Sequence, residues 1–238
     1  MEKYKVVVTD LGYKTYEPEK SILKKINAEV ILTECKSAKE VGEACSDAHG
    51  VIVRMAPCTE EAINMMEKCR VIARYGVGVD NVALNAATKK GIKVVNVPDY
   101  CFEEVSDQAL ALFLACARKT SRRDQQIRSG LWDIGASDPI YRISGKTFGL
   151  VGYGNIPRVL HRKLKGFNLK KTLVFDPFVQ ESIIMENGGI PADLETLLKE
   201  SDYISIHAPL NDKTRHMFSD PQFKKMKNTA IIINTSRG

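Results

Sequence analysis

The chain has 238 residues, of which 44% are hydrophobic and 27% charged, and this length and balance are those of a globular protein with two small domains or one large one. Its formal net charge of +6 suits anionic ligands such as carboxylates and pyrophosphate, but the basic residues are spread too evenly to indicate a nucleic-acid partner. The longest apolar run, residues 109–117, is far shorter than the ~20 residues of a membrane span, and the N-terminus lacks the layout of a signal peptide, so we expect a cytoplasmic protein without a membrane partner.

Short runs rich in valine and isoleucine alternate with helical patterns along residues 1–101. Strands are predicted at 5–9, 29–32, 50–54, 71–75 and 93–97. Helices are predicted between them, at 17–27, 38–46, 59–67 and 82–90. Pro18 is tolerated in the first turn of its helix, and Thr59 suits a helix N-cap. This alternation predicts a parallel sheet that is covered by helices on both faces.

A second alternating series follows a long helix that is predicted at 102–119. The middle of this helix, residues 109–117, is apolar on every side, so we expect it to be buried between domains or between subunits, as in a dimer. After a loop-rich stretch at 130–144, strands are predicted at 147–151, 172–175, 203–206 and 230–234. The fold class is therefore α/β, with two doubly wound parallel-sheet domains at 1–101 and 102–238.

The strongest local motif is a glycine-rich turn between a strand and a helix. Gly152 permits a tight turn, and Gly154 allows the backbone to approach a pyrophosphate. The N–H groups of Asn155 and Ile156 then open a helix whose N-terminus attracts an anion. Pro157 replaces the third glycine of the usual pattern, and it loses only an N–H that has no partner in the first turn.

An acidic residue follows this turn at the distance that dinucleotide sites require. Asp176 ends the next predicted strand, where its carboxylate can accept hydrogen bonds from the adenosine ribose hydroxyls and would repel a 2′-phosphate. The pattern therefore predicts NAD as cofactor rather than NADP. A dinucleotide-type fold that binds no nucleotide is the alternative.

The six cysteines, at 35, 45, 58, 69, 101 and 116, have neither Cys-x-x-Cys nor metal-finger spacing. We expect them to be small buried side chains in a reducing compartment, and we expect no metal site.

Several segments in order resemble the D-isomer-specific 2-hydroxyacid dehydrogenase family. These are the Gly-x-Gly-x-Asp-Asn loop within 74–81, the helix at 96–112, the His-x-Pro-Leu segment at 207–210 and the Asn-x-x-Arg-Gly signature at 234–238. The sequences at 97–101 and at 130–133 are most similar to the phosphoglycerate-dehydrogenase-like and C-terminal-binding-protein-like branches. The resemblance implies a flavodoxin-like substrate domain followed by a Rossmann NAD-binding domain.

The resemblance also implies roles for residues that would meet the substrate. Backbone N–H groups of Gly76, Val77 and Gly78 would hold the carboxylate of a 2-hydroxy or 2-oxo acid, and Arg54 would lie near the active cleft. Arg237 would be catalytic, because its planar guanidinium can bind the carboxylate with two hydrogen bonds and polarise the 2-oxo group.

Further residues would line the cofactor by the same resemblance. They are His207, Ala208, Pro209, Thr214, Thr235 and Ser236. The implied activity is hydride transfer between a D-2-hydroxy acid and NAD by a homodimer.

The family's catalytic histidine and glutamate lie downstream of the arginine signature, so we expect this chain to be a truncated fragment that does not turn over by itself and is poorly soluble. His207 would be an alternative base. His49, His161 and His216 are expected at the surface, and Gln108 stands where many members have histidine. Two other hypotheses stay open, an NAD(H)-sensing, corepressor-like binding protein and an inactive truncated product.

Overall fold

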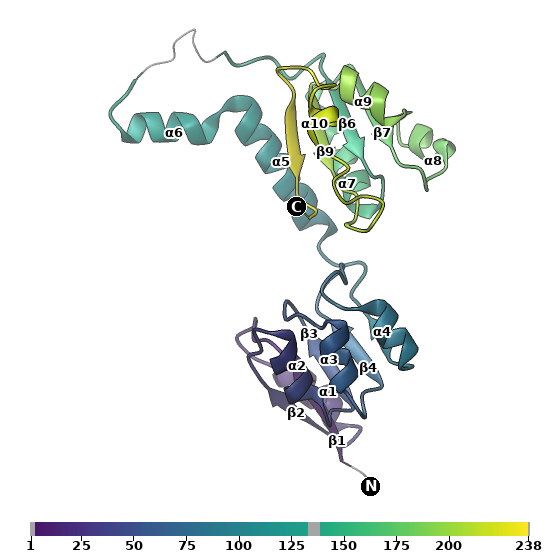
Figure 1. Cartoon of the computed structure of the whole chain (residues 1–238). Helices are drawn as coiled ribbons and strands as arrows, with labels where there is room; N and C mark the ends of the chain where they lie inside the picture. Colours follow the sequence, from purple (N-terminus) through teal and green to yellow (C-terminus); the bar gives the residue numbers. More distant parts are fainter. Residues whose placement is uncertain (1–2, 133–138, 238) are drawn as a thin grey trace. The chain divides into compact units, whose positions relative to one another are not determined.

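The computed structural model describes residues 3–132 and 139–237, which form two compact units, Met1–Tyr100 and Cys101–Gly238 (Figure 1). Gly238 of the arginine signature and Asp133, the last residue of the Gly-Leu-Trp-Asp wording, lie outside the described residues. Within the described ranges, no helix combines the length and the apolar character that crossing a membrane requires.

The first unit is a five-stranded parallel sheet in the order β2-β1-β3-β4-β5, which is the flavodoxin-like order. Its elements in chain order are β1 (Tyr4–Val8), α1 (Glu17–Lys24), β2 (Ala28–Leu32), α2 (Ala38–Cys45), β3 (Gly50–Val53), α3 (Glu60–Met65), β4 (Val71–Arg74), α4 (Leu84–Lys89) and β5 (Lys93–Val95). The strand order reverses direction at β1, so the carboxyl ends of β1 and β3 flank the crevice where such sheets bind ligands.

Local chemistry explains where the helices of this unit begin. Pro18 lies in the first turn of α1, where its missing N–H costs nothing. The Thr59 hydroxyl accepts the N–H of Ala62 and caps α3, as the sequence predicts. The core is built from the apolar faces of these elements, and Cys45 and Cys58 are buried within it. Burial raises the pKa of each of these two thiols to about 12, so they pack as small hydrophobic side chains.

The second unit is a parallel sheet in the order β10-β9-β6-β7-β8, which is the order of the first five strands of a Rossmann fold. Its elements are α5 (Phe102–Arg118), α6 (Thr120–Arg128), β6 (Thr147–Val151), α7 (Asn155–Leu164), the 3-10 turn η1 (Lys165–Phe167), β7 (Lys171–Phe175), α8 (Glu181–Glu186), β8 (Ile190–Pro191), α9 (Leu194–Glu200), β9 (Tyr203–Ile206), α10 (Asp220–Phe223) and β10 (Ile231–Asn234). Both sheets are therefore of the predicted α/β class.

The central strand β6 is buried along its whole length and separates two apolar cores. Phe148 and Leu150 face the core that contains residues of α5, α7 and α8. Val151 faces the other core, which includes Leu197 and Leu198 of α9. This two-sided burial explains why β6 is a continuous apolar run rather than an alternating one.

Within this chain only one stripe of α5 is buried, and the expected burial of the helix between domains or between subunits stays a prediction. Ala109, Phe113 and Ala117 are buried, but Leu112 is 37% exposed and Cys116 is exposed. The buried residues recur every four positions, because a single helix turns only one stripe toward the sheet. Beyond α5, a left-handed residue at 119 with φ 56° precedes a second helix, α6, which the sequence analysis did not predict.

Candidate active site

In the second unit, strand β6 runs directly into the turn Gly152-Tyr153-Gly154. Gly152 has a φ of 90°, and a Cβ at this position would lie 3.0 Å from the carbonyl carbon of His207. Only glycine accommodates both conditions. Because β6 and β9 flank the point where the strand order reverses, this contact marks the ligand crevice of the sheet.

The start of α7 has the features of an anion site. Hydrogen bonding of the helix begins where the N–H of Arg158 donates to the carbonyl of Gly154 at 3.3 Å. The N–H groups of Asn155 and Ile156 precede that bond, so they have no partner within the helix. A Cβ on Gly154 would meet no heavy atom within 4 Å, so the approach to these donors is open.

Asp176 lies one residue beyond the end of β7 and is bound to the turn. One carboxylate oxygen accepts the N–H of Tyr153 at 2.7 Å, and the other accepts the N–H of Phe178 at 2.9 Å. Each carboxylate oxygen has two acceptor positions, so Asp176 keeps capacity for two further donors. The predicted glycine turn and its predicted acidic partner are thus in direct contact.

His207 follows β9 and is partly buried. Its N–H donates to the carbonyl of Val151 at 2.7 Å, and its Nε2 lies 2.8 Å from the hydroxyl of Ser205. Burial lowers the pKa of His207 to about 4, so the imidazole is neutral at physiological pH. A general base works best with a pKa near the working pH, and His207 does not meet that requirement.

The segment after His207 folds back on itself through Thr214. The Thr214 hydroxyl accepts the N–H of Asn211 at 2.9 Å and donates to the carbonyl of Pro209. These contacts fix the loop that carries Ala208 and Pro209 beside the end of β9.

The end of β10 forms a second ordered loop. Asn234 accepts the N–H of Ser236 at 2.9 Å and donates to the carbonyl of Arg237 at 2.9 Å. The Ser236 hydroxyl donates to the carbonyl of Ile206 at 3.1 Å, which joins this loop to β9. The hydroxyl oxygen of Thr235 is buried without a hydrogen-bond partner among the described residues.

A pocket of about 190 Å³ lies between these two loops. It brings together four of the predicted site residues, Ala208, Pro209, Thr214 and Arg237. His216, an exposed residue as predicted, also lines this pocket.

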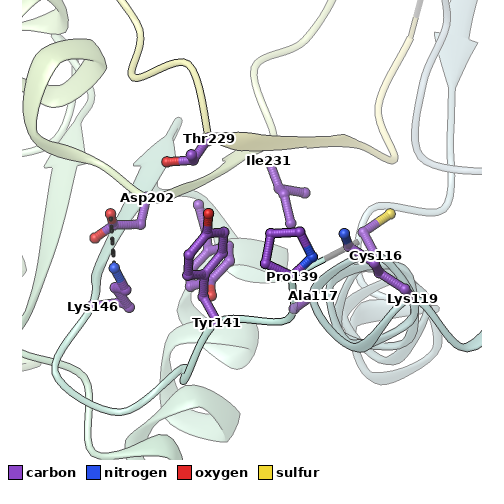
Figure 2. Close-up of a pocket in the computed structure, with 10 residues that line it drawn as sticks. Cys116, Ala117, Lys119, Pro139, Tyr141, Lys146, Asp202, Thr229 and Ile231 are labelled. Carbon is purple, nitrogen blue, oxygen red and sulfur yellow. Dashed lines mark ion pairs between the residues drawn. The ribbon is translucent and has the colours of Figure 1, made fainter. Parts of the chain in front are cut away.

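A second pocket, of about 210 Å³, lies at the opposite edge of the same sheet (Figure 2). It includes the first residues of β9 and β10, Tyr203 and Ile231, together with Tyr141. Lys146 and Asp202 form an ion pair across it at 3.8 Å. Parallel α/β sheets bind their ligands at the carboxyl edge, so the pocket that contains Arg237 is the candidate site.

In the first unit, the predicted substrate loop follows β4. Gly76 has a φ of 141°, and its carbonyl accepts the N–H of Val97 at 3.0 Å. Asn96 donates to the carbonyl of Val77 at 2.7 Å. Of the three predicted donors, the N–H of Gly76 is already bound to the carbonyl of Arg74 at 2.9 Å. The N–H groups of Val77 and Gly78 make no hydrogen bond within the described part of the chain, so they remain free to bind an anion.

Arg54 is held by its backbone rather than by its side chain. The buried Asp10 accepts the N–H of Arg54 at 2.9 Å and also those of Met55 and Ala56. The Arg54 side chain lies on Gly12, where a Cβ would stand 2.5 Å from Nη1. Asp10 was missed by the sequence analysis, and its only signal there is an acidic residue just after an apolar strand.

Arg74 was missed as well, although it opens the segment that resembles the substrate loop. It is only 9% exposed, and its Nε has no hydrogen-bond partner among the described residues. Its Nη1 lies 1.6 Å from where a Cβ on Gly76 would be, so the guanidinium packs directly against the loop. The signal that could have identified Arg74 is a charged residue at the end of an apolar strand, just before Gly-x-Gly.

The expectation that His161 lies at the surface is wrong. It is 5% exposed and shares the buried face of α7 with Leu160 and Leu164. Its polar neighbours on α7, Arg162 and Lys163, suggest a surface stretch, but they lie on other faces of the helix.

Comparison with known proteins agrees with this geometry. Residues 110–238 match the family model described as D-isomer specific 2-hydroxyacid dehydrogenase, NAD binding domain. The chain is 35% identical over 242 residues to a hydroxypyruvate reductase of Thermotoga maritima, covering all of this chain and 76% of that protein. It is 38% identical over 207 residues to a glyoxylate reductase of Korarchaeum cryptofilum, covering 85% of this chain and 62% of that protein.

Among solved structures, a D-lactate dehydrogenase from Aquifex aeolicus, complexed with NAD and lactic acid, aligns with a TM-score of 0.88 and 26% identity. The alignment covers 98% of this chain and 69% of that one. The chain spans less than two thirds of the length of some relatives, 62% of the Korarchaeum protein and 56% of a glyoxylate reductase of Thermococcus litoralis. The matched model covers more than half of the chain, and the protein therefore belongs to the D-isomer specific 2-hydroxyacid dehydrogenase family.

Proposed function

We propose that this chain is part of an NAD-dependent oxidoreductase that transfers a hydride between a D-2-hydroxy acid and NAD. Reduction of the 2-oxo acid is the reverse reaction. The observation that carries the proposal is the hydrogen bond between Asp176, which follows β7, and the Gly152–Gly154 turn, which leads into α7. It unites a pyrophosphate site and a ribose acceptor in one place.

The described residues fit a bound dinucleotide. The free N–H groups of Asn155 and Ile156 would bind the pyrophosphate, and the remaining acceptor positions of Asp176 would take the ribose hydroxyls. The buried hydroxyl of Thr235 lacks a partner and would gain one from the cofactor. NAD is proposed over NADP because a 2′-phosphate beside the Asp176 carboxylate would add like-charge repulsion.

The substrate would be bound through its carboxylate. Free N–H groups of Val77 and Gly78 suit a carboxylate, and Arg54 and Arg74 supply positive charge at the same edge of the first sheet. In the second unit, Arg237 supplies a positive charge that would stabilise negative charge on the 2-oxo oxygen of a bound acid. The nicotinamide, when bound, supplies or accepts the hydride at the substrate's C2.

His207 would act as a neutral neighbour of the cofactor rather than as the base. Its pKa of about 4 and its contact with Gly152 both support a packing role. We also propose a cytoplasmic homodimer, in which the exposed stripe of α5 around Leu112 and Cys116 is covered by the partner subunit.

Two measurements test this function. Titration of the protein with NADH and NADPH should show tighter binding of NADH, and equal or tighter binding of NADPH would contradict the cofactor proposal. NADH formation by the full protein should then be followed with NAD and D- or L-2-hydroxy acids such as glycerate and lactate. Turnover of the L-enantiomers in preference to the D-enantiomers would contradict the proposed reaction.

A further inference from the structure

A buried hydrogen bond joins the glycine turn to the body of α7. Tyr153, the residue between Gly152 and Gly154, is fully buried, and its phenol oxygen lies 2.8 Å from Nδ1 of His161. The two rings meet edge to face with their centroids 5.9 Å apart. This contact ties the turn to the helix independently of the helical backbone.

Tyr153 is the one residue of the turn that has a side chain, and all of its polar groups are bound. Its N–H donates to Asp176, and its carbonyl accepts a hydrogen bond from Nε of Arg158 at 3.0 Å. The Arg158 guanidinium carbon also lies 5.6 Å from the centre of the Tyr153 ring. The shape of the turn is therefore determined largely by how Tyr153 is held.

The pair is neutral at physiological pH. Burial raises the pKa of Tyr153, against an opposing effect of Arg158, and burial lowers the pKa of His161, with a further contribution from Lys165. Tyr153 therefore keeps its hydrogen, and when neutral His161 carries its proton on Nε2, the phenol donates to Nδ1.

The surroundings of His161 oppose a positive charge. Arg158 on α7 acts on Tyr153, and Lys165 at the start of η1 acts on His161, and both are cations. The His161 ring lies beside Gly189, and the other two side chains nearest to this glycine are the apolar ones of Ile184 and Val174. The Asp176 carboxylate contacts the pair through the backbone N–H of Tyr153 rather than through either ring.

Protonation of His161 would reverse the hydrogen bond with Tyr153, because Nδ1–H would then donate to the phenol oxygen. A hydrogen on Nδ1 removes the acceptor that the phenol uses, so the buried phenol hydrogen is left without a partner. The imidazolium would also lie in a buried site near two cations. Both effects act on Tyr153 and therefore on the turn.

We propose that Tyr153 and His161 are positioning residues for the cofactor, whose neutral hydrogen bond holds the Gly152–Gly154 turn in the shape that binds a pyrophosphate and is reversed when His161 is protonated. The inference rests on the proposed function, because it requires the turn to bind a dinucleotide. Cofactor affinity then decreases as the pH falls below the pKa of His161, which burial holds under the ordinary histidine value of 6.5.

The test uses ADP-ribose, which has the pyrophosphate and both riboses but no acid-labile dihydronicotinamide, and measures its dissociation constant calorimetrically between about pH 8 and pH 5. Wild-type affinity should fall toward the acid end of this range, where His161 becomes protonated. His161→Gln keeps an acceptor for the phenol but does not titrate, so it should bind within about threefold of wild type at pH 8 and lose little affinity on acidification. Tyr153→Phe should bind about tenfold more weakly than wild type at pH 8.

Tyr203→Phe is the matched control, because Tyr203 is also buried in this sheet, but at its opposite edge. It should bind ADP-ribose like wild type at every pH. Titration of His161 by NMR in the wild-type protein gives a readout that does not depend on how the variants fold. Because binding and protonation are linked, saturating ADP-ribose should lower the pKa of His161.

The outcomes separate the two proposals. If the wild-type protein does not bind ADP-ribose at pH 8, the proposed cofactor function fails and this inference fails with it. If the protein binds, but wild type and His161→Gln lose affinity in parallel or ADP-ribose leaves the His161 pKa unchanged, the inference alone is overturned.

Discussion

Gly152 and His207 approach each other so closely that a Cβ on residue 152 would stand 3.0 Å from the carbonyl carbon of residue 207. The Gly152→Ala substitution should therefore both strain a backbone with a φ of 90° and push the ends of β6 and β9 apart. We expect a loss of about 1–3 kcal/mol in the free energy of unfolding and at least tenfold weaker NADH binding.

Gly166→Ala is the control for this substitution. Gly166 is exposed in η1, and a Cβ there would meet nothing within 4 Å. Denaturant unfolding and NADH titration should leave this variant close to wild type. If the two variants had equal stability and equal NADH affinity, the close approach of Gly152 and His207 would have no effect on either property.

Asp176→Ala should narrow the preference for NADH over NADPH. The variant loses the proposed ribose acceptor and the negative charge that would repel a 2′-phosphate, so the dissociation constant for NADH should rise roughly tenfold or more while that for NADPH stays constant or falls. The ratio of the two constants is the measurement.

A carboxylate remote from the turn controls for lost backbone hydrogen bonds. Asp193 caps α9 by accepting the N–H of Thr196 at 2.7 Å. Asp193→Ala should cost about 1 kcal/mol of stability but leave the NADH to NADPH ratio unchanged. If Asp176→Ala also leaves the ratio unchanged, Asp176 does not select the cofactor.

Arg237→Ala should lower kcat/KM for 2-oxo acid reduction by about two decades or more in the full protein, because a buried charge-assisted contact is worth ~3 kcal/mol. NADH binding should change little. Arg128→Ala removes another arginine, one that pairs with Asp124 on α6, and should have no kinetic effect. An Arg237→Ala variant within threefold of wild type would contradict the assigned role.

The lowered pKa of His207 predicts how the stability of the protein depends on pH. Its pKa is lowered from 6.5 to about 4, so the unfolded chain takes up a proton at a higher pH than the folded one. The free energy of unfolding should therefore fall as the pH drops from about 6.5 to about 4, with roughly 1–3 kcal/mol lost through this residue.

His207→Gln should flatten that part of the pH profile in denaturant unfolding. His216→Gln serves as the comparison, because His216 is exposed. A His207→Gln profile that is as steep as that of wild type would show that His207 does not titrate as described.

The sequence predicts most elements of this fold because local patterns determine them. Runs such as 147–151 and 203–206 are apolar on both faces, and this is enough to identify central parallel strands. The glycine turn and Asp176 were also identified, because their spacing along the chain reflects one strand–helix–strand unit.

Contacts between residues that are far apart in the sequence could not be predicted from local patterns. Asp10 and Arg54 are far apart in sequence and meet only because β1 and β3 are neighbours in the sheet. The buried positions of Arg74 and His161 depend on which side of an element faces the core, and polar residues give no periodic signal of this. The apolar composition of residues 109–117 likewise does not tell which stripe of α5 the sheet of this chain covers.

The Asp10 carboxylate binds the 54–56 loop through backbone N–H groups alone, and every residue except proline offers that group. The path of the loop is consequently insensitive to which side chains it displays. Residues 54 and 55 can therefore be replaced by mutation while the main chain stays in place, and this edge of the sheet can present different side chains without the cost of refolding.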